Sequence, residues 1–177
     1  MTALNEIIIN GVPQEGGRKI KAQIESDLQG DLARPNYATT VEWVSAYQTR
    51  TGLKDNSVIL GDEPPVYGGD GKGASPQELL LTSIGNCLIA TFVGGLSAAG
   101  ISIKQLAVDV SGQVNFAAAF GVEKGNPGFF EIDAVVRIQT DADADEVEAL
   151  LQRLYPTAPI PATITQPTPI NLRFDHV

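Results

Sequence analysis

The longest uncharged stretch of the sequence, residues Leu79–Ile103, constrains the fold more than any other feature. Its 25 residues, as a helix, would be long enough to cross a lipid bilayer. Polar and glycine residues interrupt it throughout, among them Thr82, Ser83, Asn86, Thr91, Ser97, Gly85, Gly94, Gly95 and Gly100. Such a composition is unfavourable for membrane insertion. The sequence therefore favours a helix in the core of a soluble protein and leaves a membrane span as the alternative.

Local signals set the expected limits of this central helix. Ser75 suits the N-cap, Pro76 the first helical position, and Glu78 the third, from which it can reach back in a capping box. Gly100 is expected to end the helix. A helix that is apolar on every side is covered on all its faces by sheet or by other helices. Cys87, the only cysteine, lies in this helix and is therefore expected to be buried.

The sequence before the central helix predicts one short helix and one β-hairpin. Apolar residues at helical spacing between Gly17 and Gly30 indicate a helix on the surface. The β-rich runs Thr40–Val44 and Ser57–Leu60 flank a polar segment that contains Arg50, and we expect them to form a hairpin. Asp62–Ala74 is rich in proline and glycine and is expected to be a loop.

The sequence after the central helix predicts strands, a helix and a last strand. Residues Gln105–Phe116 and Phe130–Ile138 alternate apolar with polar side chains, as strands with one wet face do. Asp143–Leu154 places its apolar residues on one helical face. The proline-rich stretch Pro156–Pro169 leads into an expected strand, Ile170–Phe174. This order is typical of an α+β fold with helices packed on one side of a sheet.

Charge and cysteine content exclude several classes of function. The net charge is −9 and no basic run is present, so a nucleic-acid partner would be repelled. One cysteine cannot form an internal disulfide, which excludes a disulfide-stapled secreted scaffold and fits a reducing compartment. Residues 1–10 have no basic segment of the kind that begins a signal peptide. We therefore expect a cytoplasmic location.

Three further motifs have ordinary structural explanations. Gly69–Gly73 lacks the spacing and the final Lys-Ser/Thr of a phosphate-binding loop, and we expect a flexible loop. Asp141, Asp143 and Asp145 alternate like calcium ligands but lack the required glycine and final glutamate, so they are expected to complement the N-terminus of the next helix. His176 is the only histidine and has too few partners for a metal or catalytic site. The sequence predicts neither a metal nor a cofactor.

The residues around Cys87 carry a specific pattern. By residue type alone, a lone buried cysteine is a small hydrophobic residue. Four strings accompany this one: Asp62-Glu63-Pro64-Pro65, Gly68-Gly69-Asp70-Gly71, Ser75-Pro76-Gln77-Glu78-Leu79-Leu80-Leu81 and Gly85-Asn86-Cys87. Together they resemble the pattern of the OsmC/Ohr family, "DEPP…GG.G..P.ELL…G.C". From Asn10 to Trp43 the sequence is similar to the longer, OsmC-like branch of that family.

The resemblance implies a fold and an assembly. Members are α+β proteins in which antiparallel sheets wrap around a buried central helix, and two copies form an intertwined homodimer. The resemblance implies one such domain over residues 1–177, with an N-terminal extension and short helix at 1–37 and the core at 38–177.

The resemblance also implies an activity with one part missing. Active members are thiol peroxidases that reduce organic hydroperoxides, and Cys87 matches their peroxidatic cysteine. Their second, resolving cysteine is matched by Ala158, so any oxidised Cys87 depends on an external thiol reductant. Arg50 matches an arginine that favours the thiolate electrostatically. The family's carboxylate partner falls at Gln77, and Glu78 matches a neighbouring glutamate.

Helix geometry limits what Glu78 can do. Nine residues separate it from Cys87, which places the two roughly 180° apart around a straight helix and about 13 Å apart along it. Glu78 can therefore act only on Cys87 of the partner subunit, and otherwise it only caps the helix. Two functions follow: a one-cysteine peroxidase, or a catalytically silent dimer that binds another apolar small molecule.

Overall fold

The computed structural model describes residues 6–176 and shows an α+β fold of helices and small antiparallel sheets. Contacts within the chain divide it into two compact units, unit 1 up to Thr82 and unit 2 from Ser83. The prediction about residues 1–10 lies partly outside the described residues, since these begin at residue 6.

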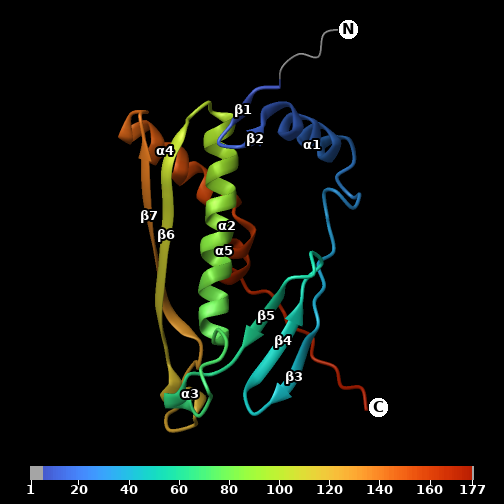
Figure 1. The fold of residues 1–177 in the computed structure, drawn as a ribbon, viewed down its shortest axis with the longest axis vertical. Coiled ribbons are helices and arrows are strands. Elements are labelled where there is room, and N and C mark those ends of the chain that lie inside the picture. Colours follow the sequence, from blue (N-terminus) through green and yellow to red (C-terminus); the bar gives the residue numbers. More distant parts are fainter. Residues whose placement is uncertain (1–5, 177) are drawn as a thin grey trace. The chain divides into compact units, whose positions relative to one another are not determined.

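Unit 1 begins with a small β-pair and a surface helix (Figure 1). Strands β1 (Ile8–Ile9) and β2 (Val12–Pro13) pair antiparallel and lead directly into α1 (Gln14–Ser26). No residue of α1 is buried, as expected of a surface helix. The helix begins and ends earlier than the spacing of its apolar residues predicts, and Leu28, which lies beyond its end, is 62% exposed.

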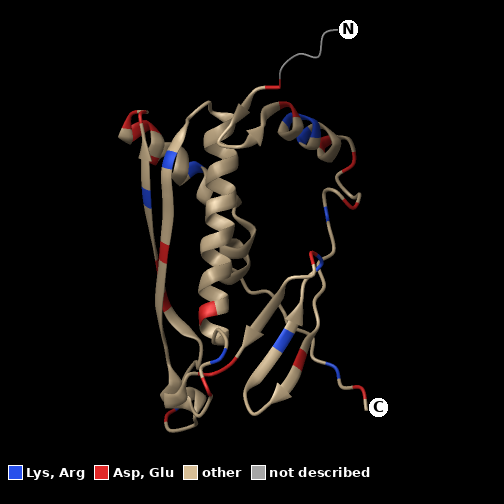
Figure 2. Cartoon of the chain, viewed as in Figure 1, with Lys and Arg blue, Asp and Glu red and all other residues tan. Residues whose placement is uncertain are grey.

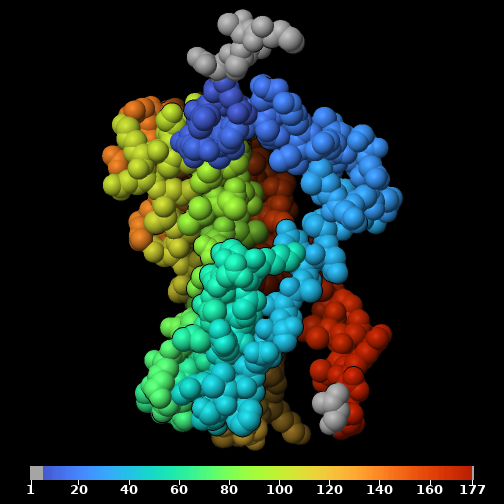
Figure 3. Space-filling view, turned by 45° about the vertical axis from the view of Figure 1, so that its right-hand side comes forward, coloured from blue at the N-terminus to red at the C-terminus, as the bar shows by residue number. Residues whose placement is uncertain are grey.

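The predicted hairpin is wrong, because a third strand lies between its two arms. Strands β3 (Val41–Ser45), β4 (Gln48–Gly52) and β5 (Val58–Gly61) form an antiparallel sheet in that order. The middle strand is the polar segment that was expected to be a connection. Most of the side chains in this sheet are exposed. Because the sheet covers little apolar core, its middle strand β4 can form from polar residues without alternating apolar ones. The sheet is the cyan to teal surface in Figure 3.

The long helix α2 (Pro76–Ala98) begins and ends where its capping signals predict. Ser75 and Glu78 form the expected capping box at its start. At its end Gly100 has a φ of +79°, Gly100 N–H donates to the carbonyl of Ser97, and Ile101 N–H donates to the carbonyl of Leu96. These two bonds form a Schellman motif, for which glycine is suited because it adopts positive φ without steric cost.

Helix α2 is uncharged beyond its first turn, as the tan ribbon in Figure 2 shows. Of the described helices it is the one long and apolar enough to cross a membrane by length and composition, and the core helix of a soluble protein passes the same test. One of its faces is buried within the chain, at Ile84, Gly85, Leu88, Phe92, Leu96 and Ser97. The sequence predicted burial on every face of α2, and within a single chain only one face is buried.

Unit 2 is built on a long two-stranded ribbon. Strands β6 (Ile103–Val114) and β7 (Phe129–Thr140) pair antiparallel along their whole length, and α3 (Phe116–Ala119) lies in their connection. The register places Leu106, Val108 and Val110 opposite Ile138, Val136 and Ala134 on one face. The other face is polar, and on it Asp109 and Arg137 form an ion pair. Both strands and the wet face agree with the sequence prediction.

Two glycines allow α2 to pack closely against its neighbours in unit 2. A Cβ at Gly85 would touch the Val110 side chain of β6, at 3.4 Å. A Cβ at Gly95 would overlap the Leu154 side chain at the end of α4 (Ala144–Leu154). The buried apolar residues of the chain gather around this packing, and these are Ile84, Leu88, Phe92, Leu96, Ile101, Val147 and Ala158.

The C-terminal part of unit 2 confirms one prediction and contradicts another. The Asp143 side chain accepts hydrogen bonds from the N–H groups of Asp145 and Glu146, which makes it the N-cap of α4, as expected of these acidic residues. The proline-rich stretch then forms η2 (Tyr155–Thr157) and α5 (Pro159–Thr165).

The expected last strand, Ile170–Phe174, is wrong. These residues form no strand, and Ile170 is 93% exposed and Phe174 79% exposed. The alternating pattern is real, but a strand also needs the free edge of another strand to pair with. None of the described strands pairs with this segment.

Candidate functional site

Cys87 lies on α2 in unit 2, where its side chain is half-buried. Its sulfur accepts a hydrogen bond from the backbone N–H of Ile160, with a nitrogen–sulfur distance of 3.4 Å. An N–H group directed at a sulfur favours negative charge on that sulfur. Partial exposure leaves the thiol accessible to a small molecule. The residue type alone would predict a fully buried hydrophobic side chain, and Cys87 differs from that prediction because it is half-buried.

The first turn of α5 supplies this donor. Ala158, at the N-cap of α5, is fully buried, and Pro159 occupies the first helical position, where its lack of an N–H costs nothing. Ile160 follows with an N–H that has no partner further back in its own helix, so it is free to meet the sulfur. Sequence reasoning missed this group. The signal that could have found it was Pro159, a helix-start residue inside a segment interpreted as a connection.

The segment that contacts Cys87 is also the one in which the OsmC/Ohr pattern places a second cysteine. Ala158 stands at that position, two residues before the Ile160 N–H that reaches the sulfur. Two residues of chain span at most about 7 Å. The structure therefore brings the position of the missing cysteine close to Cys87.

Arg50 lies on the middle strand of the sheet in unit 1. In the strand register it lies opposite Glu42 on β3 and Leu60 on β5, and its side chain is exposed. A hollow of about 440 Å³ lies here, lined by Ala38, Thr39, Thr40, Glu42, Arg50 and Gly52. Arg50 and Cys87 belong to different units, so the expectation that they are neighbours stays a prediction.

Glu78 is engaged at the start of α2. Its carboxylate accepts hydrogen bonds from Ser75 N–H at 2.8 Å and from Ser75 Oγ at 2.9 Å, while Ser75 Oγ accepts from Glu78 N–H at 3.2 Å. The backbone N–H of Ser75 is the main cause that lowers the pKa of Glu78, followed by the Ser75 hydroxyl. Glu78 is therefore held as a carboxylate that caps the helix.

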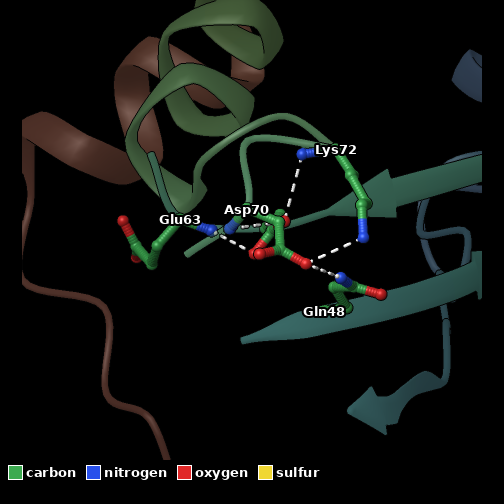
Figure 4. Close-up of polar contacts among 5 residues, drawn as sticks. Gln48, Glu63, Asp70 and Lys72 are labelled. Atoms are coloured by element: carbon green, nitrogen blue, oxygen red, sulfur yellow. Dashed lines mark hydrogen bonds and ion pairs between the residues drawn. The ribbon is translucent and has the colours of Figure 1, made fainter. Parts of the chain in front are cut away.

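A buried carboxylate organises the loop that leads to α2. Asp62 is 2% exposed, and its two oxygens accept hydrogen bonds from the backbone N–H groups of Glu63 at 2.8 Å, Asp70 at 3.2 Å and Lys72 at 3.0 Å (Figure 4). The bond from Lys72 is the main cause that lowers the pKa of Asp62. Outside this ring of bonds, the Asp70 carboxylate accepts from Gln48 Nε2 and from Lys72 Nζ.

Two glycines of the same loop are required by close backbone contacts. A Cβ at Gly69 would overlap the backbone of Glu63, and a Cβ at Gly73 would overlap the backbone of Leu60. The motif residues Asp62, Gly69 and Gly73 thus act together to fold this loop tightly. They form a structural loop rather than the flexible one expected from its composition.

No group of three or more His, Cys, Asp or Glu side chains suited to a metal ion occurs among residues 6–176. His176 lies at the end of the extended C-terminal segment. The site as described thus consists of one half-buried thiol, a backbone donor to its sulfur, and a buried alanine at the position of a second thiol.

Comparison with known proteins identifies the family. The family model described as OsmC-like protein matches residues 69–173, which is more than half of the chain. The protein therefore belongs to the OsmC-like family, as the motifs around Cys87 predict. No curated protein matches the sequence.

Solved structures show the same fold. An OsmC-like protein from Mycoplasma pneumoniae is 21% identical, with a TM-score of 0.64, over 75% of this chain and 89% of that chain. An organic hydroperoxide resistance protein OsmC from Legionella pneumophila is 15% identical, with a TM-score of 0.54, over 74% and 91%. An organic hydroperoxide resistance protein from Elizabethkingia anophelis is 14% identical, with a TM-score of 0.54, over 73% and 90%. At these identities the likeness establishes the fold alone.

Proposed function

We propose that the protein is a one-cysteine peroxidase that reduces organic hydroperoxides with Cys87 and is returned to the thiol by an external thiol reductant. The observation that carries the proposal is the Ile160 N–H donated to the Cys87 sulfur, because only a negatively charged sulfur is an effective nucleophile. Two structures of the same fold are named organic hydroperoxide resistance proteins, which supports the same chemistry.

The proposed reaction has two stages. The Cys87 thiolate attacks one peroxide oxygen, the O–O bond breaks, and the alkoxide leaves and takes a proton to become an alcohol; the sulfur is oxidised to sulfenic acid and the peroxide is reduced. An external thiol then attacks the sulfenic sulfur and releases water, leaving a mixed disulfide. A second external thiolate attacks the external sulfur of that disulfide, which frees Cys87 and carries away the oxidised reductant.

The proposal also assigns roles to Arg50 and Glu78 and includes a homodimer. Arg50 is proposed to stabilise the thiolate, and Glu78 to act on Cys87 of the partner subunit in addition to capping α2. A homodimer is supported by a stripe of small exposed residues along α2, formed by Asn86, Ala90, Gly94 and Ala98 at four-residue spacing. Side chains as small as these let a second helix approach closely. We propose that the dimer is cytoplasmic, where thiol reductants are available, and that it binds neither nucleic acid nor membrane.

Mass spectrometry after peroxide treatment tests the proposal. A stoichiometric amount of cumene hydroperoxide should add one oxygen to Cys87, and dimedone should trap the product as an adduct. Turnover should follow when dihydrolipoamide, thioredoxin or glutathione is supplied in turn. Cys87→Ser is the control and should show neither adduct nor turnover. If the folded wild-type protein yields no adduct after prolonged exposure, the peroxidase assignment is lost and the catalytically silent small-molecule binder takes its place.

A further inference from the structure

Unit 2 contains a groove that is separate from the thiol. It has a volume of about 780 Å³, and residues of β7, α2 and α4 line it. Neither Cys87 nor Ile160 is among its lining residues. Its volume falls within the roughly 300–1,000 Å³ typical of small-molecule sites. The proposed peroxidase chemistry makes no use of it.

The groove is long and its floor is apolar. Four alternate residues of β7 form the floor, namely Ile132, Ala134, Val136 and Ile138. At about 3.3 Å per residue this row runs for roughly 20 Å. Leu88 and Phe92, one helical turn apart on α2, form one wall, and Val147 and Leu151 on α4 form the other. An elongated apolar trough suits an extended alkyl chain better than a compact ring system.

The charge among the lining residues determines which head group of such a chain the groove favours. Glu148 is the only charged side chain among the described residues that line the groove. Its carboxylate lies beside Gln152, whose amide donates to it at 3.0 Å, and Tyr155 also lies at the lining. An acidic group and an aromatic ring are the partners that an ammonium ion prefers.

Most neighbouring groups that could attract an anion are occupied, and Arg153, in the last turn of α4, is not among the residues that line the groove. The N–H groups at the start of α4 are capped by Asp143. Lys104 is paired with Asp141, and Arg137 with Asp109 on the opposite, polar face of the ribbon. A carboxylate or phosphate head group would therefore meet Glu148 with no free cation beside it among the lining residues.

We propose that this groove binds a single-chain amphiphile with an ammonium head group. The alkyl chain lies along the β7 floor between α2 and α4, and the ammonium lies against Glu148 and Tyr155. The inference does not depend on the reactivity of Cys87.

Calorimetric titration of the assembled protein with dodecylamine, dodecanol and dodecanoate, each below its micelle concentration, tests the proposal. Dodecylamine should bind roughly fivefold more tightly than dodecanol, since an exposed ion pair contributes modestly, and dodecanoate should bind most weakly. Glu148→Gln should remove the preference for the amine over the alcohol. Glu146→Gln, which removes the same charge from the first turn of α4, should keep that preference.

A second pair of variants tests the location. Ala134→Trp fills the floor and should abolish binding of all three compounds, whereas Val135→Trp, at a 57% exposed position whose side chain lies on the other face of β7, should not. Methyl shifts of Ile132 and Leu151 on adding dodecylamine should confirm the site without any substitution. The proposal is overturned if dodecanoate binds as tightly as dodecylamine, or if the assembled protein binds none of the compounds because a second copy of the chain covers the groove.

Discussion

At the scale of single residues, the donor that reaches the Cys87 sulfur is a backbone group. The N–H belongs to Ile160 in the first turn of α5, and the identity of the Ile160 side chain does not affect it. Only proline, which has no N–H, removes this donor while remaining compatible with the first turn of a helix. Position 160 thus offers a pair of variants that separates the hydrogen bond from the side chain.

Ile160→Pro should slow the reaction of Cys87 with hydroperoxide about 10- to 100-fold, because a hydrogen bond to a charged group contributes roughly 1.5–3 kcal/mol. Ile160→Ala keeps the N–H and should react at nearly the wild-type rate. The measurement is the rate of dimedone labelling during peroxide treatment, with circular dichroism as the check on folding. Equal rates for the two folded variants would show that the N–H has no part in the chemistry.

Ala158→Cys should restore the missing resolving thiol. The position is buried and lies two residues before the N–H that contacts Cys87. Peroxide should then produce a disulfide between residues 158 and 87 in place of the lasting sulfenic acid, because the second thiol attacks the sulfenic sulfur. Intact mass will decrease by two hydrogens and dimedone labelling will disappear. Ala118→Cys on α3 adds a thiol elsewhere and should leave the labelling unchanged.

Asp62→Asn should destabilise the protein in a pH-dependent way. The folded state lowers the pKa of Asp62 through the N–H groups of Lys72 and Glu63. The carboxylate therefore contributes to stability above its ordinary pKa of about 3.9, and this contribution disappears as the pH falls through the lower pKa of the folded state. Urea unfolding should show the largest loss near pH 7 and a shrinking loss below pH ~4. The exposed Asp31→Asn serves as control; an equal loss for both variants contradicts the assignment.

At the scale of elements, α2 and α4 approach each other at one glycine. A Cβ at Gly95 would overlap Leu154, while a Cβ at the adjacent Gly94 would meet nothing within 4 Å. Gly95→Ala should therefore lower the free energy of unfolding by about 1–3 kcal/mol, the usual cost of overpacking. Gly17→Ala, in the exposed helix α1 where an added Cβ would likewise meet nothing within 4 Å, should raise it by about 0.5–1 kcal/mol through helix propensity. Denaturant unfolding of both variants decides the matter, and a stabilising Gly95→Ala would contradict the described packing.

The elements that sequence predicted well are those with local signals. Ser75, Pro76 and Glu78 start α2, and Gly100 ends it, through hydrogen bonds between residues at most a few positions apart. The alternation in β6 and β7 predicted a ribbon with one wet face, because one face of that ribbon packs on the helices.

The elements that sequence reasoning missed depend on distant partners. Strand β4 consists of polar residues and a glycine, although Thr51 within it is buried, so no apolar alternation marks it, and its neighbours β3 and β5 define it. Ile170–Phe174 alternates correctly but pairs with none of the described strands. The donor to Cys87 comes from residue 160, 73 positions away. Cys87 itself could be predicted from its motif, but its hydrogen-bond partner could not.

At the scale of the whole molecule, both units leave apolar side chains uncovered. Trp43 in unit 1 is 75% exposed, and Phe130 in unit 2 is 65% exposed. On α2, the stripe of Asn86, Ala90, Gly94 and Ala98 is exposed although the helix carries no charge beyond its first turn. Exposed apolar surface of this kind marks association with another protein surface. A net charge of −9 opposes non-specific association of single chains but does not cover these residues.

Ala90→Arg should therefore convert the proposed homodimer into a monomer. The substitution places a long charged side chain in the middle of the small-residue stripe, where a second helix needs close approach and has no partner for the charge. Ser111→Arg adds the same charge to the exposed wet face of the ribbon, opposite Asp133, and should leave the assembly intact. Sedimentation velocity gives the mass of each variant. If Ala90→Arg sediments as the wild-type dimer does, α2 is not the dimer contact; if the wild-type chain is itself a monomer, Glu78 has no partner subunit on which to act.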